Sequence, residues 1–481
     1  MDALSLSEPE FRRLVAMGYN QVPLIMRLPA AVLTPAALVA AAPEGDRILL
    51  ESTRVSGVDC RYSIVVPASS RRLTAKGDTY VLDGRPGTGD PMGVLRILMK
   101  SFRGYRPEGG PLFCGGAIGY FAYECNRYFE ELPRHPVDDV AIPDLYLLIA
   151  DHFVTFDHVT DELLLIASGD NHGHCRTKLD VLVTWIDRAR ANPRGPARLA
   201  VEGELAAFQS NFTPLAYEAA VERVQAYVRS GDVYQVNLSQ RLQVAVASTG
   251  LALYETLSRL NPVHFASYLQ LDGFDIVSAS PERLVRLERG RLMTRPIAGT
   301  RRRGTPEEDA RFVQELLTDE KEISEHAMLV DLERNDLGRV SRYGSVKVTR
   351  PMAITKYAHV MHLESEVEGE LDAGKDFLDV IAATFPGGTI TGVPKVRTME
   401  VITELEPNAR GIYTGSIGTI SFAGDMDLNI VIRTILLKDS AAYVNVGGGV
   451  VWDSVPRREY KETMNKARSQ LTALGQHGMS S

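Results

Sequence analysis

The sequence predicts a protein that mixes α-helices and β-strands, and three observations support this. Before residue 190, short runs of branched and aromatic residues alternate with turns rich in Gly, Pro and Asp, which is typical of strands. After residue 205, strand-like runs alternate with amphipathic helical patterns. Between them, residues 189–205 read ARANPRGPARLAVEGEL, and their prolines and glycines indicate a linker. We therefore expect one domain over residues 15–190 and a second over residues 205–476.

The individual elements follow from their periodicity. Before the linker, strands are expected over Arg61–Val66, Tyr146–Phe156 and Asp161–Ala167, and after it over Tyr234–Val244 and Phe274–Leu287. Residues 215–229 have the spacing of an amphipathic helix. The clearest helix is the last one, where helical spacing forms one apolar seam from Tyr460, Met464, Ala467, Leu471 and Leu474.

Composition excludes several classes of protein. The 481 residues are 44% hydrophobic and 24% charged, which suits a globular protein with a sizeable core. A net charge of -8 without a long basic run argues against nucleic-acid binding. The four cysteines show no CxxC spacing, so neither a zinc ribbon nor a redox pair is expected. No secretory signal or membrane span is visible either, because the apolar run at residues 28–43 is interrupted by Pro35. We expect a cytoplasmic protein.

Two helical segments carry acidic residues that could bind a cation. Glu459, Glu462 and Lys466 share one face of the last helix, an arrangement that is also typical of a solvated surface. In the segment around Glu325, apolar residues follow at +3, +4 and +7, so we expect Glu325 on the inward face. A buried carboxylate needs an ion pair or a metal, and carboxylates from two helices suit Mg²⁺. The pattern alone leaves both alternatives open.

A third candidate feature is the triplet Gly447–Gly449, which follows the strand-like run AAYVNV. Glycines let a backbone approach an anionic ligand closely, but they also occur at bulges and tight bends. The nearby stretch GGTITGVPK lacks the adjacent Gly-Lys-Ser/Thr of a phosphate-binding loop, so nucleotide binding is not expected.

Ordered motifs resemble the chorismate-binding enzymes, most densely over residues 217–474. They are GDVYQVNLSQR, SASPERLVRL, RPIAGTRRRG, EISEHAMLVDLERNDLGRV, HVMHLESEVEG, FPGGTITGVPKVR, GIYTGSIG, VGGGVV and EYKETMNKA. The family includes component I of anthranilate synthase and of aminodeoxychorismate synthase, isochorismate synthase and salicylate synthase. The resemblance implies an α+β fold of two packed antiparallel β-sheets flanked by helices, with a chorismate-binding catalytic domain over residues 205–476.

The resemblance also implies a role for particular residues. Glu325 and Glu462 match the family's Mg²⁺ ligands, with Glu459 close by. Glu282 matches the general acid that protonates the departing ring hydroxyl, which is otherwise a poor leaving group. His362 and Thr389 match residues that line the ring. The pocket for the substrate carboxylates is matched by Tyr413, Arg433, Gly447, Gly449 and Lys466.

Two positions indicate which reaction to expect. Isochorismate and salicylate synthases carry a water-activating lysine where Gln235 stands, so the resemblance implies a member that uses ammonia. Bacterial aminodeoxychorismate synthases typically carry a nucleophilic lysine where Ala298 stands. Alanine has no nucleophile, so the resemblance favours direct attack of ammonia at ring carbon 2. Gly388, Gly448 and the sequence DLERND favour the aminodeoxychorismate branch instead. We give more weight to Ala298, which bears on the chemistry, than to Gly388 and Gly448, which bear on packing.

We therefore expect component I of an anthranilate synthase, a carbon–oxygen lyase that makes anthranilate and pyruvate from chorismate for tryptophan biosynthesis. Ammonia would come from a separate glutamine amidotransferase subunit, because the chain shows no nucleophilic cysteine motif of its own. One alternative is component I of aminodeoxychorismate synthase, which serves p-aminobenzoate and folate synthesis. A second is an inactive relative that binds tryptophan or a partner, although the complete set of Glu282, Glu325, Glu462 and Lys466 argues against it.

Tryptophan feedback is a separate question. The sequence LLES at residues 49–52 resembles the inhibitor site of anthranilate synthases, which makes Leu50, Glu51 and Ser52 candidate tryptophan-binding residues. Asn261 and Pro262 fit the same site. The next four residues, VHFA, depart from the usual Ser-Pro-Tyr-Met, so the sequence leaves feedback control open.

Overall fold

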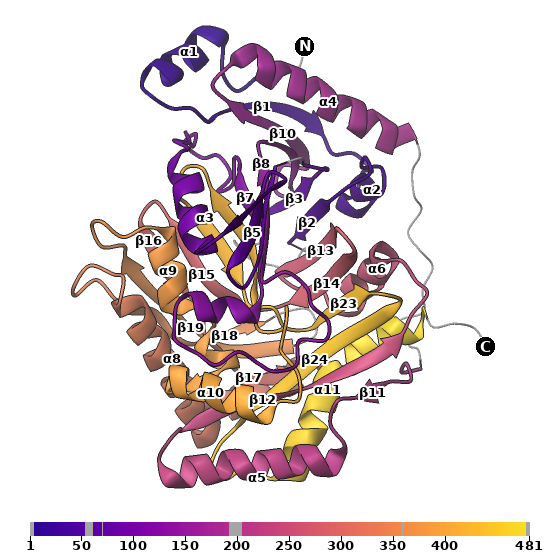
Figure 1. Cartoon of the computed structure of the whole chain (residues 1–481), viewed down its shortest axis with the longest axis vertical. Helices are drawn as coiled ribbons and strands as arrows, with labels where there is room; N and C mark the ends of the chain where they lie inside the picture. The colour runs from indigo at the N-terminus through magenta and orange to yellow at the C-terminus, as the bar shows by residue number, and fades with distance from the viewer. Residues whose placement is uncertain (1–3, 53–60, 70, 192–203, 357–359, 478–481) are drawn as a thin grey trace.

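The computed structural model of the chain describes residues 4–52, 61–69, 71–191, 204–356 and 360–477. Its strands form two large antiparallel sheets of twelve strands each, with helices around them (Figure 1). This architecture confirms the expected α+β fold of two packed antiparallel sheets flanked by helices.

The first sheet combines strands from both ends of the chain. Its order is β1 (Val22–Pro29), β10 (Glu162–Gly169), β9 (His152–Asp157), β3 (Tyr62–Val66), β2 (Arg47–Glu51), β13 (Phe265–Leu271), β14 (Phe274–Ser280), β23 (Thr434–Lys438), β24 (Ala441–Val450), β12 (Gln235–Ala245) and β11 (Gln209–Ser210), with β20 (Gly392–Val393) paired to β12.

The second sheet is built in the same way. Its order is β17 (Ile297–Arg302), β19 (Val360–Glu370), β16 (Arg291–Thr294), β15 (Arg283–Glu288), β22 (Met426–Asn429), β21 (Ser416–Ser421), β7 (Gly116–Phe121), β8 (Leu145–Ala150), β4 (Arg72–Lys76), β5 (Thr79–Leu82) and β6 (Arg85–Thr88), with β18 (Lys347–Lys356) paired to β19.

A shared apolar core joins the two sheets face to face. Residues of the first sheet such as Ile48 and Ile276 pack there against residues of the second such as Ile118 and Leu148. The first sheet's other face is covered by α1 (Glu8–Ala16), α2 (Pro35–Ala40), α4 (His172–Ala191), α6 (Gly250–Leu260) and α11 (Pro456–Gly475). The second sheet packs against α3 (Pro91–Lys100), α8 (Glu320–Gly338) and α9 (Phe377–Thr384).

The remaining elements are helices and 3₁₀ turns. They are α5 (Pro214–Ser230), α7 (Pro306–Thr318), α10 (Lys395–Leu405) and the 3₁₀ turns η1 (Tyr123–Tyr128) and η2 (Gly388–Ile390). The expected helix over 215–229 is α5, in which Thr213 caps the first turn and Gly231, at φ +80°, ends the helix. The expected C-terminal helix is α11, and its seam residues Ala467, Leu471 and Leu474 are buried.

Two strands expected to be continuous are each divided between the sheets. Residues 146–156 form β8 of the second sheet and β9 of the first, and residues 274–287 form β14 of the first and β15 of the second. In the second case the chain changes sheets at Pro281 and Glu282. Proline cannot donate to a strand ladder, which fits a break at this point.

The chain also crosses between sheets on a larger scale. β2 pairs with β13 in the first sheet and β7 pairs with β21 in the second, so residues 15–190 and 205–476 contribute to both sheets. The linker was expected to begin at Ala189, but α4 continues through Ala191, and residues 192–203 lie outside the described residues.

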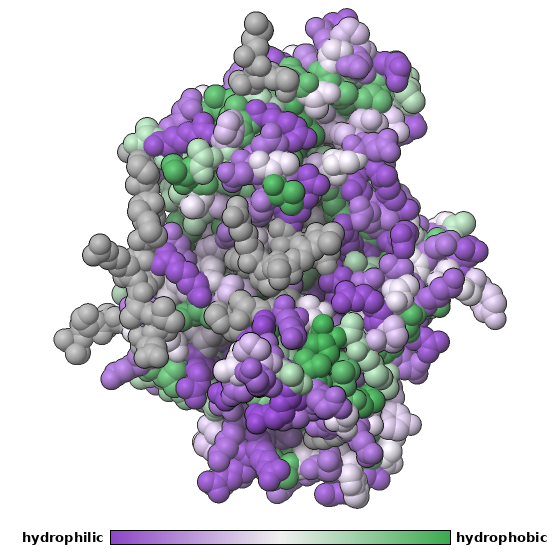
Figure 2. All heavy atoms as spheres, turned by 180° about the vertical axis from the view of Figure 1, so that it is seen from behind, coloured by the Kyte–Doolittle hydropathy of each residue, from purple (hydrophilic) through white to green (hydrophobic). Residues whose placement is uncertain are grey.

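The surface is predominantly polar on the face shown in Figure 2, with small apolar groups scattered between hydrophilic ones. Of the helices in the described ranges, none combines the length and apolarity that crossing a membrane requires.

Candidate active site

A cavity of about 620 Å³ brings together most of the residues that the sequence singles out. Its walls come from β12, β17, β24, α8, η2 and α11, together with the crossing at Glu282. Eleven of the expected catalytic, substrate and metal residues line it: Gln235, Glu282, Glu325, Thr389, Tyr413, Arg433, Gly447, Gly449, Glu459, Glu462 and Lys466. Ala298 lines it too.

Glu282 is held where the chain passes from one sheet to the other. Its side chain is buried, and the hydroxyl of Thr389 donates to Oε1 at 2.8 Å. Burial raises the pKa of Glu282 to about 7, although the Thr389 hydrogen bond and the Lys466 charge act in the opposite direction. Glu282 can therefore carry a proton near neutral pH, as a general acid must.

The glycines of β24 make room for polar side chains on β12. A Cβ on Gly447 would lie 2.6 Å from Oδ1 of Asn237 and 2.8 Å from the Tyr413 hydroxyl oxygen. A Cβ on Gly449 would lie 2.7 Å from Nε2 of Gln235. These two glycines are therefore required by close approach inside the cavity rather than by a bend.

Helix α11 presents its charged face to the cavity. Lys466 forms an ion pair with Glu462 at 2.7 Å and donates to the carbonyl of Gly447 at 3.1 Å. Arg433 donates to the carbonyl of Lys466 at 2.6 Å and has a left-handed backbone at φ +54°. Such a conformation is strained for a non-glycine residue and is frequent at functional sites. Burial lowers the pKa of this guanidinium.

Glu325 lies differently from the sequence prediction. It is half-buried and lines the cavity with Leu329, whereas the buried residues of α8 include His326, Glu333 and Leu337. The apolar spacing misplaced the inward face because this helix buries polar residues: the His326 ring bonds to Ser365 at 2.6 Å.

The three acidic residues expected near the metal come from two helices, Glu325 from α8 and Glu459 and Glu462 from α11. Within the described residues, no group of three His, Cys, Asp or Glu side chains converges as a complete metal site. Mg²⁺ does not require one, because it commonly uses one or two protein carboxylates and takes its other ligands from water and substrate. The donor chemistry therefore fits Mg²⁺.

His362 stands next to the cavity and not among its lining residues. It lies on β19, where its ring bonds to the hydroxyl of Thr300 at 2.9 Å, and Thr300 does line the cavity. Burial lowers the pKa of His362 to about 4, and the Arg433 charge adds to this. The imidazole is neutral at neutral pH.

A buried ion pair that the sequence analysis did not identify supports the cavity floor. Arg410 bonds to Glu406 at 2.6 Å and to the carbonyls of Asn237 at 2.6 Å and Ile390 at 2.9 Å. Glu406 in turn accepts from the backbone N–H of Ser239 at 2.8 Å. The only signal in the sequence is a Glu and an Arg four residues apart, which is too common to single out.

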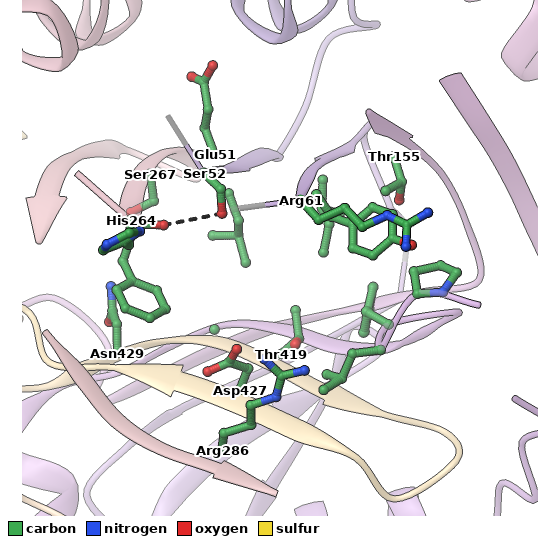
Figure 3. A pocket seen from close by; sticks show the side chains of 18 of the residues that line it. Glu51, Ser52, Arg61, Thr155, His264, Ser267, Arg286, Thr419, Asp427 and Asn429 are labelled. Atoms are coloured by element: carbon green, nitrogen blue, oxygen red, sulfur yellow. Dashed lines mark hydrogen bonds between the residues drawn. The ribbon is translucent and has the colours of Figure 1, made fainter. Parts of the chain in front are cut away.

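A second cavity, of about 330 Å³, lies between the two sheets (Figure 3). Leu50, Glu51 and Ser52 line it, and Asn261 and Pro262 do not. The Ser52 hydroxyl donates to the carbonyl of His264 at 3.3 Å.

The charged groups around this second cavity are largely satisfied by protein partners. The Glu51 carboxylate points away from the opening in Figure 3 and accepts a hydrogen bond from Tyr254. Burial raises the pKa of Glu51. Arg106 pairs with Glu288 at 2.7 Å and with Asp425 at 3.0 Å.

Comparisons with known proteins place the chain in one enzyme family. The family model described as chorismate binding enzyme matches residues 48–472. The chain is 41% identical over 487 residues to anthranilate synthase component 1 of Aquifex aeolicus, covering 98% of both chains. It is 44% identical over 437 residues to aminodeoxychorismate synthase component 1 of Bacillus subtilis, covering 89% of this chain and 91% of that one. The structure of anthranilate synthase component I from Streptococcus pneumoniae superposes with a TM-score of 0.78 at 32% identity, covering 92% of this chain and 99% of that one.

Proposed function

Because the chain belongs to the chorismate binding enzyme family, we propose that it is component I of an anthranilate synthase. In this proposal the enzyme works in the cytoplasm and supplies tryptophan biosynthesis. Chorismate and ammonia react in the larger cavity to give anthranilate and pyruvate. The observation that carries the proposal is a buried acid, Glu282, facing a cavity whose described lining residues include no amine able to attack the ring itself.

The first step is an exchange of a ring hydroxyl for an amino group. The ammonia lone pair forms a bond to ring carbon 2, the ring double bonds shift, and the hydroxyl leaves carbon 4 as water with the proton of Glu282. The new ammonium group then loses one proton, which restores protonated Glu282. The bond between the ring and the enolpyruvyl oxygen then breaks, carbon 2 loses its hydrogen as a proton, and the departing enolpyruvyl group takes up one proton to become pyruvate, which leaves the aromatic product.

The absence of a second amine supports attack by ammonia. Ala298 lines the cavity and has no nucleophile. Lys466 is the one lysine among the described lining residues, and its ammonium group is engaged by Glu462 and by the Gly447 carbonyl. A covalent lysine intermediate at carbon 2 is therefore not supported.

Aminodeoxychorismate synthase component I is the second candidate, because the chain is 44% identical to such a protein from Bacillus subtilis. The two glycines that favour this branch carry different weight. A Cβ on Gly388 would lie 2.0 Å from Cδ2 of Leu332, so this glycine serves packing. A Cβ on Gly448 would have its closest neighbour at 3.6 Å, so alanine would fit there. Neither glycine supplies chemistry that distinguishes the products.

Mg²⁺ is proposed as the cofactor, held by Glu325 and Glu462 with Glu459 nearby. Arg301 pairs with Glu322 at 3.1 Å and with Asp319 at 3.6 Å, so its single positive charge offsets only part of the negative charge at the cavity wall. The carboxylates of α8 and α11 still outnumber the cations, and the substrate brings two more negative charges. When bound, a divalent cation would neutralise a substrate carboxylate and fix its position.

Ammonia is proposed to come from a glutamine amidotransferase subunit, since relatives of this chain are named as one component of a synthase. The cysteines of the described residues, Cys114, Cys125 and Cys175, are all buried. Burial raises the pKa of Cys114 to about 12 and that of Cys175 to about 11, so these thiols are poor nucleophiles. Cys60 lies outside the described residues.

The second cavity is a candidate site for tryptophan as a feedback ligand, with Leu50 and Ser52 at its wall. Because Asn261 and Pro262 do not line it and Glu51 is bonded to Tyr254, binding there would depend on Ser52 and on the opposite wall. Titration of the initial rate with tryptophan tests this. A rate unchanged at saturating tryptophan removes feedback control from the proposal.

Product analysis tests the main proposal. Purified protein is incubated with chorismate, Mg²⁺ and an ammonium salt, and fluorescence and chromatography are followed. We expect anthranilate and pyruvate in equal amounts. Accumulation of aminodeoxychorismate instead would establish the second candidate, and unconsumed chorismate with saturable tryptophan binding would indicate an inactive binding protein. Glu325→Gln and Glu462→Gln should raise the Mg²⁺ concentration needed for half-maximal rate by about 10-fold or more.

A further inference from the structure

Asn237 presents an unused hydrogen-bond acceptor to the larger cavity. Its side chain lines that cavity, and 8% of the residue is exposed. Its amide oxygen Oδ1 is buried, and no donor in the described part of the chain reaches it. A buried polar atom is rarely left unpaired, because it has lost its hydrogen bonds to water. The unused oxygen therefore marks a place where a donor is expected to bind.

The backbone around Asn237 is firmly held. Its N–H donates to the carbonyl of Thr391 at 2.7 Å, and its own carbonyl accepts from Arg410 at 2.6 Å. Across β12 and β24, Asn237 pairs with Gly449. Gln235 stands two residues earlier on β12 and lines the same cavity, since alternate residues of a strand share a face. The strand thus fixes the direction in which the Asn237 side chain points.

The amide of Asn237 has one favourable orientation. Its nitrogen Nδ2 lies 3.5 Å from the carbonyl oxygen of Thr389, which is the limit for a hydrogen bond. With the amide turned over, Oδ1 would face that carbonyl, and two acceptors would meet with no hydrogen between them. The hydroxyl of Thr389 donates to Glu282 at 2.8 Å, so its hydrogen is already used. The nitrogen of the amide therefore faces the side of the cavity where Glu282 lies.

The oxygen of the amide faces the cations of the cavity. A Cβ on Gly447 would lie 2.6 Å from Oδ1 of Asn237 and 2.8 Å from the Tyr413 hydroxyl oxygen, so this glycine leaves room for the amide. Lys466 donates to the carbonyl of Gly447 at 3.1 Å. Lys466 and Arg433 are the two cations among the described lining residues, so we expect the carboxylates of the substrate at this end.

The reactants offer two kinds of donor to Oδ1. The carboxylates of chorismate only accept hydrogen bonds, which leaves the ring hydroxyl and the N–H groups of ammonia. Ammonia attacks carbon 2, which stands between carbons 1 and 3, the two carbons whose substituents carry the carboxylates. The ring hydroxyl stands at carbon 4, where Glu282 protonates it. An acceptor at the carboxylate end, turned away from Glu282, is better placed for ammonia.

We propose that Oδ1 of Asn237 accepts a hydrogen bond from the attacking ammonia and turns its lone pair toward ring carbon 2. This inference rests on the proposed function and assigns the nitrogen subsite within it. A neutral amide suits ammonia, because a carboxylate there would favour ammonium, which has no lone pair. As the carbon–nitrogen bond forms, the nitrogen becomes positive and its N–H groups become stronger donors, so the contact strengthens in the transition state.

Steady-state kinetics of Asn237→Leu test the assignment, because leucine has a similar size and no acceptor. Ammonium is varied at saturating chorismate, and chorismate is varied at saturating ammonium. We expect kcat/KM for ammonia to fall by about 10-fold or more, and KM for chorismate to stay within about twofold. Calorimetry with chorismate and Mg²⁺ in the absence of ammonium should likewise give a dissociation constant within about twofold of the wild-type value.

Two further variants complete the design. Gln243→Leu is the matched control, since it makes the same kind of change on β12 at an exposed position that does not line the cavity. Its kinetic and binding constants should equal those of the wild type. Asn237→Ala removes the same acceptor without adding bulk, so it should show the same separation of the two substrates if the leucine variant does not fold.

Three results in the Asn237 variants would overturn the inference. One is an unchanged kcat/KM for ammonia. Another is weaker chorismate binding with ammonia unaffected, which would place the ring hydroxyl on Oδ1. The third is an equal loss for both substrates, which would indicate a purely structural role. A wild type that forms no amino product would refute the proposed function and this inference together, whereas an active wild type with unaffected variants would refute this inference alone.

Discussion

Replacement of Glu282 by glutamine should make the protein more stable and less active at the same time. Glutamine keeps the size of the side chain and can remain neutral in the buried site. The wild-type carboxyl must instead ionise in that site as the pH rises. A group whose folded pKa lies above its unfolded pKa favours folding while it is protonated, and this advantage disappears as pH rises through the folded pKa.

The size of the effect follows from burial. The pKa of Glu282 rises from its ordinary value of 4.5 to about 7. Each tenfold change in an ionisation constant is worth about 1.4 kcal/mol, so ionised Glu282 lowers the free energy of unfolding by about 3 kcal/mol. This loss develops between about pH 4.5 and pH 7 and is complete above it. Because 8% of the residue is exposed, solvent screening reduces the figure little.

Thermal unfolding of wild type and Glu282→Gln across pH measures this difference. The two midpoints should coincide near pH 4 and differ by several degrees above about pH 7, with the variant higher. The variant should also lose about 10²-fold or more of its rate with ammonium and chorismate, since its amide cannot protonate the leaving hydroxyl. A midpoint difference that does not change with pH would refute the burial argument. Full activity in the variant would refute the assignment of Glu282 as the acid.

Other parts of the cavity give independent predictions. Gly447→Ala should reduce activity strongly, because its Cβ would lie 2.6 Å from Oδ1 of Asn237. Gly448→Ala should stay near wild-type activity, because the closest neighbour of its Cβ would lie at 3.6 Å. Steady-state rates with ammonium compare the two variants. Arg410→Met leaves the buried Glu406 carboxylate without its partner and should lower the free energy of unfolding by about 3–5 kcal/mol. Arg397→Met removes a pair with Glu400 that is partly exposed, so it should alter the free energy of unfolding by less than about 1 kcal/mol. Denaturant titration of both arginine variants tests this contrast.

Much of the secondary structure could be predicted from sequence because local periodicity reports which face of an element is buried. Helix α5 begins and ends within one residue of its expected bounds, since Thr213 and Pro214 mark its start and Gly231 its end. The strands at residues 146–156 and 274–287 were recognised as strands, but not as pairs that change sheets. The crossings fall at Asp151 and at Pro281 and Glu282, and a short polar interruption of this kind does not show whether the next strand stays in the same sheet.

The orientation of α8 shows where local pattern is insufficient. Apolar residues at +3, +4 and +7 placed Glu325 inside, yet the helix turns His326 and Glu333 toward the sheet. Polar residues can occupy such positions when the facing strand offers a partner, as Ser365 does for His326. That partner lies 39 residues further along the chain, so no local window contains it.

The sequence by itself determined the kinds of chemistry available: an acid at Glu282, carboxylates at Glu325 and Glu462, and no amine at Gln235 or Ala298. These are properties of the side chains and of their order along the chain. Only the tertiary structure decided how that acid behaves. Glu282 meets the Thr389 hydroxyl across 107 residues, at the point where the chain passes from one sheet to the other. A pKa depends on burial and neighbouring charge, and these exist only once distant segments have packed together.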